Sequence, residues 1–304
     1  MVRDAPDLFK IKLLHHGAII SEKRRVALLK ETIVKRGPSQ PEGPFEGDFV
    51  LEDASGHEKF IKGKVISSGA YGDVYIYESN ITHKKIAVKH FKEHFDGEML
   101  LLSLWELNGD IHKFMECGLV NARALGGRVI MNLMDGNLND LVHSLNLNEG
   151  MVKEVIRQLT VGAICLKEKG YKYADYKAVN ILYEKDGDGF KLYYGDLGSI
   201  DILGGEDAVA TFPPYESFDE WPSDDPEMVW GIAMTVIDML SNKYENLYDY
   251  LMNLFGYDNL GDVDVKYLNK MVDEIKDEPQ IRDLLKKMLP RDRITLEELL
   301  KEVN

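Results

Sequence analysis

The chain has 304 residues, of which 44% are hydrophobic and 29% are charged, a composition that indicates a soluble globular protein and excludes a largely disordered one. Acidic residues outnumber basic ones by 52 to 37, and the formal charge of −15 disfavours a nucleic-acid backbone as the main partner. No apolar run in the sequence approaches the roughly 20 residues that a membrane span needs.

The N-terminus and the cysteines bear on the compartment. The first residues include Asp4 and Asp7 and lack the apolar core of a secretory signal peptide. Cys117 and Cys165 stand far apart in the sequence and form no C-x-x-C motif, so we expect neither a disulfide framework nor a thiolate metal site. Together these features predict a cytoplasmic, intracellular protein.

Residues 1–45 are expected to form an extension ahead of the folded region. Ser21 is suited to cap a helix that runs to Arg36, and the proline- and glycine-rich stretch 37–44 is expected to be a linker. The extension has two interpretations: it docks a partner or covers the following region, or it is a solvated basic helix.

From Phe49 the hydrophobic pattern shifts towards a period of two, which predicts strands. One helix is expected at Glu98–Leu107. The expected strands are Phe60–Ile66, Val74–Glu78, Lys85–Lys89, Ile111–Cys117 and Arg128–Leu133. Residues 46–134 are therefore expected to form a strand-rich lobe.

The remaining residues, 135–304, are mostly helical in pattern. Apolar side chains between Val152 and Leu166 recur at steps of three and four, which predicts a buried helix. The turn Lys185–Gly189 is expected to join two short strands in a hairpin. These strands are Ile181–Tyr183 and Lys191–Tyr193, and the further expected helices are Pro226–Leu240, Leu247–Leu254, Val265–Ile275, Ile281–Met288 and Thr295–Val303. The pattern predicts an α+β protein with two lobes and a cleft between them.

A glycine-rich turn and a lysine make up the first group of candidate functional residues. Gly69 and Gly72 lie between two expected strands, where backbone N–H groups can approach phosphate oxygens. Lys89 ends the next strand and could bridge such oxygens, and Glu98 on the following helix could pair with it. A tight hairpin without a ligand, a solvated lysine and a surface acid are the alternative interpretations.

Carboxylates and an amide on two later loops make up the second group. Asn180 and Asp196 offer the oxygen ligands that Mg²⁺ prefers. Asp175 is placed to accept a proton from an incoming hydroxyl, and Lys177 could neutralise a transferred group. Two acidic turns without a metal are the alternative.

In their order, these groups resemble the motifs of the eukaryotic-type serine/threonine protein kinase superfamily, from Phe60 to the C-terminus. The carboxylate group carries the most specific part, because Asp175–Asn180 resembles the D-L-K-x-x-N catalytic loop and Asp196–Gly198 resembles D-F-G. The other matching segments are Ser67–Val74 with the glycine-rich loop, Ile86–Lys89 with V-A-I-K, Glu98 with the αC glutamate, Ala210–Glu216 with the stretch ending in A-P-E, and Arg293 with the arginine that pairs with that glutamate.

The resemblance implies a bilobal protein-kinase-like fold, with a small antiparallel β-sheet N-lobe that has one main helix and a larger, mostly α-helical C-lobe. It implies that Asp175 and Lys177 act in catalysis and that Asn180 and Asp196 bind Mg²⁺. The residues implied to bind ATP are Ile66, Ser67, Gly69, Gly72, Val74, Ala87, Lys89, Glu98, Met131, Leu133 and Leu182.

The chain departs from the family pattern in its H-R-D triplet, which is Tyr173-Ala174-Asp175. The arginine that normally contacts a phosphorylated activation loop is therefore missing, and the interval from Asp196 to Glu216 is short. Both features suggest activity that does not wait for loop phosphorylation. Met228 stands where the family usually has an aspartate that anchors the catalytic loop, which leaves that anchoring open.

By this resemblance the protein is expected to transfer the γ-phosphoryl of ATP to a serine or threonine hydroxyl of a protein substrate, with Lys177 favouring that specificity. The charge of −15 favours basic substrates. A pseudokinase or scaffold, motivated by Ala174 and Met228, and a kinase of small molecules are the alternatives. Two segments, 194–199 and 210–216, also resemble kinases carried by large DNA viruses, which would place the protein in a host cytoplasm or a virion.

Overall fold

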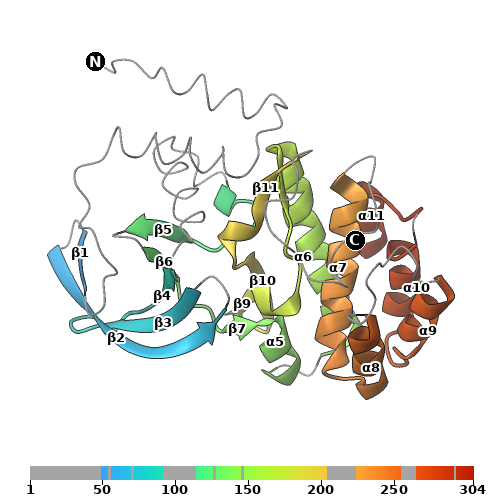
Figure 1. Cartoon of the computed structure of the whole chain (residues 1–304), viewed down its shortest axis with the longest axis horizontal. Coiled ribbons are helices and arrows are strands. Elements are labelled where there is room, and N and C mark those ends of the chain that lie inside the picture. Colours follow the sequence, from blue (N-terminus) through green and yellow to red (C-terminus); the bar gives the residue numbers. More distant parts are fainter. Residues whose placement is uncertain are drawn as a thin grey trace, which may run out of the picture. The chain divides into compact units, whose positions relative to one another are not determined.

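The computed structural model describes residues 49–53, 56–69, 72–91, 114–125, 128–144, 147–203, 224–254, 265–290 and 292–304 (Figure 1). The expected helix Ser21–Arg36, the linker 37–44, the helix Glu98–Leu107 and the segment Ala210–Glu216 lie outside these residues. The described chain divides into two compact units. The first contains all strands up to Leu133, and the second contains the chain from Met134 onward together with Glu116–Leu119.

The first unit is a six-stranded antiparallel sheet with the strand order β1-β2-β3-β4-β6-β5 (Figure 1). Its strands are β1 (Phe49–Asp53), β2 (Gly56–Ser68), β3 (Gly72–Ser79), β4 (Lys85–Phe91), β5 (Ala122–Leu125) and β6 (Arg128–Asn132). Strands predicted from the period-two pattern are thus confirmed for β2, β3, β4 and β6.

The strand predicted at Ile111–Cys117 is wrong for its described part. Phe114 and Met115 are helical, and Glu116–Gly118 form a turn. Gly118 has a φ of +80°, a backbone conformation in the left-handed region that a strand does not contain. Phe114 and Cys117 are buried in this stretch, but they belong to a helix end and a turn and not to a strand.

One face of the sheet carries its own small hydrophobic cluster. Side chains from four strands meet there, and Tyr75 packs against them. The cluster consists of Phe60, Tyr77, Ile86, Val88 and Ile130. Because successive strand residues point to opposite faces, Ala87 and Lys89 of β4 belong to the other face.

His90 lies at the end of β4, with its Nε2 3.0 Å from the hydroxyl of Tyr77. Burial lowers the pKa of His90 to about 4, and the positive charges of Arg128 and Lys62 act in the same direction. The folded protein therefore binds fewer protons than the unfolded chain, whose histidine has a pKa near 6.5. Stability contributed by the neutral imidazole is complete above pH 6.5 and is lost as the pH falls towards 4.

We expect the NMR titration of the His90 ring to have its midpoint near pH 4. The urea midpoint of the wild type should fall more between pH 7 and pH 5 than that of a His90→Gln variant, which lacks the imidazole of residue 90. A ring midpoint near 6.5 would contradict the buried, neutral state of His90.

The second unit is mainly helical and contains two small sheets (Figure 1). Its helices are α5 (Leu138–Ser144), α6 (Glu149–Glu168), α7 (Asp224–Ser241), α8 (Glu245–Leu254), α9 (Val265–Asp273), α10 (Pro279–Met288) and α11 (Leu296–Val303). Its strands are β7 (Gly136–Asn137), β8 (Tyr171–Tyr173), β9 (Ile181–Asp186), β10 (Gly189–Tyr194) and β11 (Ile200–Ile202), with short 3-10 turns η1 (Ala178–Asn180) and η2 (Leu197–Ser199).

Local sequence explains where these helices begin. Asn148 caps α6 by accepting a hydrogen bond from the backbone N–H of Met151, and Thr295 forms a reciprocal capping box with Glu298 at the start of α11. Helix α7 is buried on nearly all sides from Met228 to Leu240, so it forms the centre of the unit. The six helices and the β9–β10 hairpin predicted for this region are confirmed.

The α+β fold class is confirmed, since an antiparallel sheet unit is followed by a mostly helical one. Among the helices that the structure describes, none combines the length and apolar character needed to cross a membrane.

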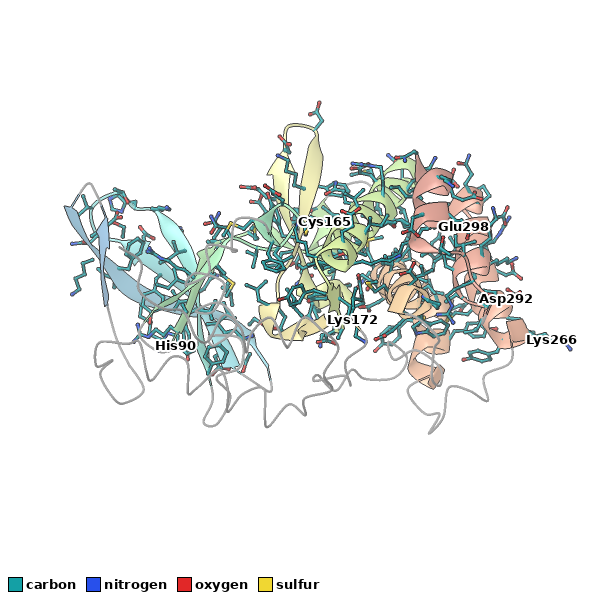
Figure 2. The ribbon with its side chains drawn as sticks, turned by 90° about the horizontal axis from the view of Figure 1, so that it is seen from above. His90, Cys165, Lys172, Lys266, Asp292 and Glu298 are labelled. Carbon is teal, nitrogen blue, oxygen red and sulfur yellow. A yellow bond between two sulfur atoms is a disulfide. The ribbon has the colours of Figure 1, made fainter. Side chains whose placement is uncertain are left out.

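The expectation of unpaired cysteines is wrong. Cys117 and Cys165 form a disulfide in the second unit, with their Cα atoms 5.2 Å apart (Figure 2). Their separation of 48 residues in the sequence gave no sign of this, because the turn at Cys117 packs beside α6 only in the folded chain. The expected lack of a disulfide was one reason for predicting a cytoplasmic location, so that reason no longer holds and the location stays a prediction.

Candidate functional site

The loop between β8 and β9 brings three of the predicted site residues together in the second unit. Asp175 is only 4% exposed, and its Oδ2 lies 2.6 Å from the Nζ of Lys177. The amide nitrogen of Asn180 donates to the same oxygen at 2.8 Å and to the Asp175 carbonyl at 3.1 Å. The other carboxylate oxygen, Oδ1, is buried and has no hydrogen-bond partner in the described structure.

A buried carboxylate oxygen without a partner is energetically costly, so it points to a donor that the described residues do not supply. A ligand hydroxyl is such a donor. The ammonium group of Lys177 forms an ion pair with the carboxylate, and the amide of Asn180 fixes its orientation.

Helix α7 holds this loop from below. Asp238 accepts a hydrogen bond from the backbone N–H of Ala178 at 3.0 Å. The ring of Tyr176 lies against Gly231, where a Cβ would come within 2.5 Å of the Tyr176 Cδ2. Strand β8, which leads into the loop, is tied to the same helix by Lys172, whose Nζ lies 2.8 Å from Glu227 (Figure 2).

These contacts show which residue anchors the loop in a chain that has Met228 at the expected anchoring position. Met228 is 1% exposed in the apolar interior of α7, and the carboxylate that anchors the loop is Asp238, more than two turns further along the helix. Sequence reasoning missed Asp238, although it is the one charged residue between Met228 and Leu240, which was a usable indication.

Three buried tyrosines flank the loop. The ring of Tyr173 lies 4.6 Å from that of Tyr194 and 5.2 Å from that of Tyr176, measured between centroids. Burial raises the pKa of Tyr173 well above its ordinary value, and the charges of Asp196 and Asp175 act in the same direction. The hydroxyl is thus neutral at any physiological pH. The tyrosine that replaces the usual histidine of the triplet is held by aromatic packing.

Asp196 is the N-cap residue of η2, and its neighbours connect it to Asn180. The backbone N–H of Gly195 donates to the Asn180 carbonyl at 2.8 Å, and Ser199 donates from its backbone to the Asp196 carbonyl at 3.1 Å. Ser199 is 1% exposed, and its carbonyl accepts from the N–H of Ala174 at 2.7 Å. The two predicted metal ligands therefore stand on segments joined directly by a backbone hydrogen bond.

The donor set of this region fits a hard cation that retains water and phosphate ligands. Asn180 uses its amide nitrogen towards Asp175, which leaves its oxygen for a metal, and Asp196 supplies a carboxylate. Within the described ranges there is no group of three or more His, Cys, Asp or Glu side chains arranged to hold a metal ion. A cation here would depend on ligands from a bound phosphate or from water.

In the first unit, strand register places four predicted ATP-binding residues on one face of the sheet. Val74 pairs with Lys89, and Ala87 pairs with Met131. Directly opposed residues share a face, as do residues two apart, so all four side chains belong to the face opposite the hydrophobic cluster. Lys89 is 9% exposed, and its Nζ lies 5.5 Å from the centroid of the Phe91 ring. Glu98, its predicted partner, lies outside the described residues.

The glycine-rich turn connects β2 and β3. The N–H of Gly69 donates to the carbonyl of Gly72 at 2.9 Å, which closes the hairpin. A Cβ on Gly72 would lie 2.5 Å from the carbonyl oxygen of His90, whereas a Cβ on Gly69 would make an ordinary contact, 3.8 Å from the carbonyl oxygen of Gly72. Gly72 is therefore required by the close approach of β3 and β4, and Gly69 is the glycine that remains for a ligand role.

The other predicted ATP-binding residues are spread over both units. Ser67 pairs with Val74 across the hairpin, and Ile66 is exposed on β2. Leu133 follows β6 at the end of the first unit. Leu182 belongs to the second unit, where it packs against the backbone of Gly195.

Arg293 is buried near the C-terminus of the second unit. Its Nη1 donates to the carbonyl of Pro226 at 2.9 Å, and its Nε donates to the carbonyl of Pro290 at 2.8 Å. The guanidinium lies 5.0 Å from the centroid of the Trp230 ring, and burial lowers the pKa of Arg293 to about 9. Its predicted partner, Glu216, lies outside the described residues.

No family model matches the chain, but comparison with curated proteins finds distant similarity to protein kinases. Mitogen-activated protein kinase kinase kinase 3 of Arabidopsis thaliana is 21% identical over 226 residues, which cover 68% of this chain and 36% of the relative. Serine/threonine-protein kinase STE20 of Debaryomyces hansenii is 25% identical over 188 residues, covering 59% of this chain and 17% of the relative. Serine/threonine-protein kinase CST20 of Candida albicans is 25% identical over 201 residues, which cover 62% of this chain and 16% of the relative.

The chain thus spans between 16% and 36% of the length of these relatives. Their names agree in describing protein kinases, and they come from a plant and two yeasts. They give no support to the resemblance to kinases of large DNA viruses.

Proposed function

This chain is a divergent member of the protein kinase superfamily, and from that premise we propose that it is an ATP- and Mg²⁺-dependent serine/threonine protein kinase. The observation that carries the proposal is the state of Asp175. One of its carboxylate oxygens is bound by Lys177 and Asn180, and the other is buried with no hydrogen-bond partner among the residues that the structure describes. A structural carboxylate would have both oxygens satisfied, whereas a catalytic base needs one oxygen for the substrate.

The proposed roles follow from the chemistry of each side chain. Asp175 accepts the proton of the substrate hydroxyl at Oδ1, and Lys177 offsets negative charge as the phosphoryl group is transferred. Asn180 and Asp196 would hold Mg²⁺, which when bound neutralises charge on the phosphates of ATP. On the first unit, Lys89 would bind phosphate oxygens, and Val74, Ala87 and Met131 would offer an apolar surface to the adenine.

A phosphotransfer assay with radiolabelled ATP and Mg²⁺ tests the proposal. A basic protein and an acidic protein are offered in parallel, each at low and high salt. We expect transfer by the wild type and not by Asp196→Asn, with a preference for the basic substrate that salt weakens, because the chain carries a charge of −15. Equal label transfer by both proteins would exclude catalysis by this site.

A pseudokinase or scaffold is the second candidate function, and the Tyr173-Ala174 substitution in the triplet favours it. Calorimetric titration with ATP, with and without Mg²⁺, separates the two. A scaffold that has lost catalysis is expected to show no Mg²⁺-dependent gain in ATP affinity. An active kinase is expected to show one that the Asp196→Asn variant lacks.

Independence from activation-loop phosphorylation is part of the same proposal. Ser199, the first residue with a hydroxyl after Asp196, is buried, and its backbone already bonds to Ala174 and Asp196. A phosphate on this side chain would need space that its 1% exposure does not offer, and positive charges close by. Loss of activity in Ser199→Ala together with phosphate found on Ser199 by mass spectrometry would contradict this.

A further inference from the structure

The Cys117–Cys165 disulfide fastens a short piece of chain to the second unit. Cys117 lies in the turn Glu116–Gly118, and Cys165 lies near the C-terminal end of α6. The segment Glu116–Leu119 belongs to the second unit, although the residues on both sides of it in the sequence belong to the first. The bond therefore fixes to α6 four residues that would otherwise be held there only by noncovalent contacts.

The fastened segment in turn holds the end of β10. The carbonyl of Gly118 accepts a hydrogen bond from the N–H of Tyr194 at 2.8 Å, and Leu119 forms a parallel bridge with Tyr194. Helix α6 holds the same tyrosine from its other end, since the Tyr194 hydroxyl donates to the Leu159 carbonyl at 2.8 Å. Cys165 and Leu159 thus connect one helix to both sides of Tyr194.

Tyr194 leads directly into the candidate site. Its ring packs on Tyr173, which is two residues before Asp175. The next residue, Gly195, bonds to the carbonyl of Asn180 at 2.8 Å, and Asp196 follows. A change in the position of the segment Glu116–Leu119 therefore reaches both predicted metal ligands through two backbone hydrogen bonds.

We propose that Cys117 and Cys165 are a reversible redox modification site whose oxidised state positions Tyr194, Gly195 and Asp196. The effect on phosphotransfer rests on the proposed function, whereas the effect on the Tyr194 segment does not. Oxidation joins the two thiols by exchange with a low-molecular-weight disulfide such as oxidised glutathione. The exchange forms one protein disulfide and two glutathione thiols, so that electrons and protons balance.

The two cysteines of the disulfide differ in their exposure to a reductant in solution. Cys117 is 1% exposed, whereas Cys165 is only partly buried. A reductant thiolate is therefore expected to attack the sulfur of Cys165 and to release Cys117 as the leaving thiol. The Cα separation of 5.2 Å lies in the range that disulfides require, so the bond forms without movement of the backbone.

Hydrogen exchange on the full chain tests the positioning directly. The protein is compared after treatment with oxidised glutathione and with a phosphine reductant. We expect reduction to speed exchange at the Tyr194 and Gly195 amides at least tenfold. The amide of Leu299, which bonds to Thr295 in α11, is the control for global unfolding, and the acceleration at Tyr194 and Gly195 should exceed any acceleration there at least tenfold. The melting temperature should fall by about 5–10 °C, because the bond closes a loop of 48 residues.

A Cys117→Ala/Cys165→Ala variant is the matched control, and its exchange should not respond to either reagent. Two thiols that still react with an alkylating reagent after the glutathione treatment would overturn the proposal. Unchanged exchange at Tyr194 and Gly195 on reduction would also overturn it. If exchange responds but neither redox state transfers phosphate, the redox site stands and the proposed kinase activity fails.

Discussion

Replacement of Asp175 by asparagine is expected to lower kcat by about 10³-fold or more, because a positioned general base contributes roughly 10² to 10⁴ to the rate. Asparagine keeps the shape of the side chain and loses the acceptor charge. It also breaks the contact with Lys177, which lies 2.6 Å from Oδ2. The measurement is the steady-state rate of label transfer from ATP at saturating protein substrate.

The control for this variant is Asp188→Asn. Asp188 is exposed at the tip of the β9–β10 hairpin, so its replacement should leave both kcat and the melting temperature unchanged. Asp175→Asn should bind ATP as the wild type does, since Asp175 is assigned to the substrate hydroxyl and not to the nucleotide. A rate within threefold of the wild type would show that Asp175 is not the base.

Gly231→Ala is expected to destabilise the second unit by about 2–3 kcal/mol, the usual cost of overpacking a close-packed interior. The new Cβ would lie 2.5 Å from the ring of Tyr176, which is itself packed against Tyr173 and Tyr194 and cannot move aside. The sign of the change in unfolding free energy distinguishes the two cases, because alanine in place of an unconstrained helical glycine stabilises a helix by about 1 kcal/mol. The measurement is the shift in the urea unfolding midpoint.

A double-mutant cycle makes that prediction specific. If the destabilisation arises from the clash with the ring, then Gly231→Ala should cost much less in a Tyr176→Leu background. The two substitutions should be non-additive by at least 1 kcal/mol in unfolding free energy, within the range seen for residues in contact. Additive effects would place the strain elsewhere in α7. A stabilised Gly231→Ala variant would contradict the close approach of the ring and the helix.

Several parts of the site could be predicted from sequence because they depend on local pattern and spacing. Two-residue alternation placed Ala87 and Lys89 on one face of a strand, and the register added Val74 and Met131 to that face. The spacing of Asp175, Lys177 and Asn180 fits one short loop, and the structure brings these three side chains into contact. The roles assigned to them stay predictions.

Other parts depend on contacts between residues that are distant in the chain. Asp238 lies 60 residues after the loop that it anchors, and no motif connects the two. Cys117 and Cys165 read as separate thiols until the turn and α6 are packed together. Gly72 matched a phosphate-binding pattern, but its requirement comes from the carbonyl of His90 on the neighbouring strand.

Periodicity, helix caps and short spacings act within a few residues of chain, so they were enough to predict the fold class, most of the helices and strands, and the residue types gathered around Asp175. The contacts that hold these parts in place became visible only in the folded chain: Asp238 bonded to the loop, three tyrosine rings around it, and a disulfide next to the segment that contacts Tyr194. These depend on which surfaces meet when apolar area is buried, and that outcome is a property of the whole packed interior.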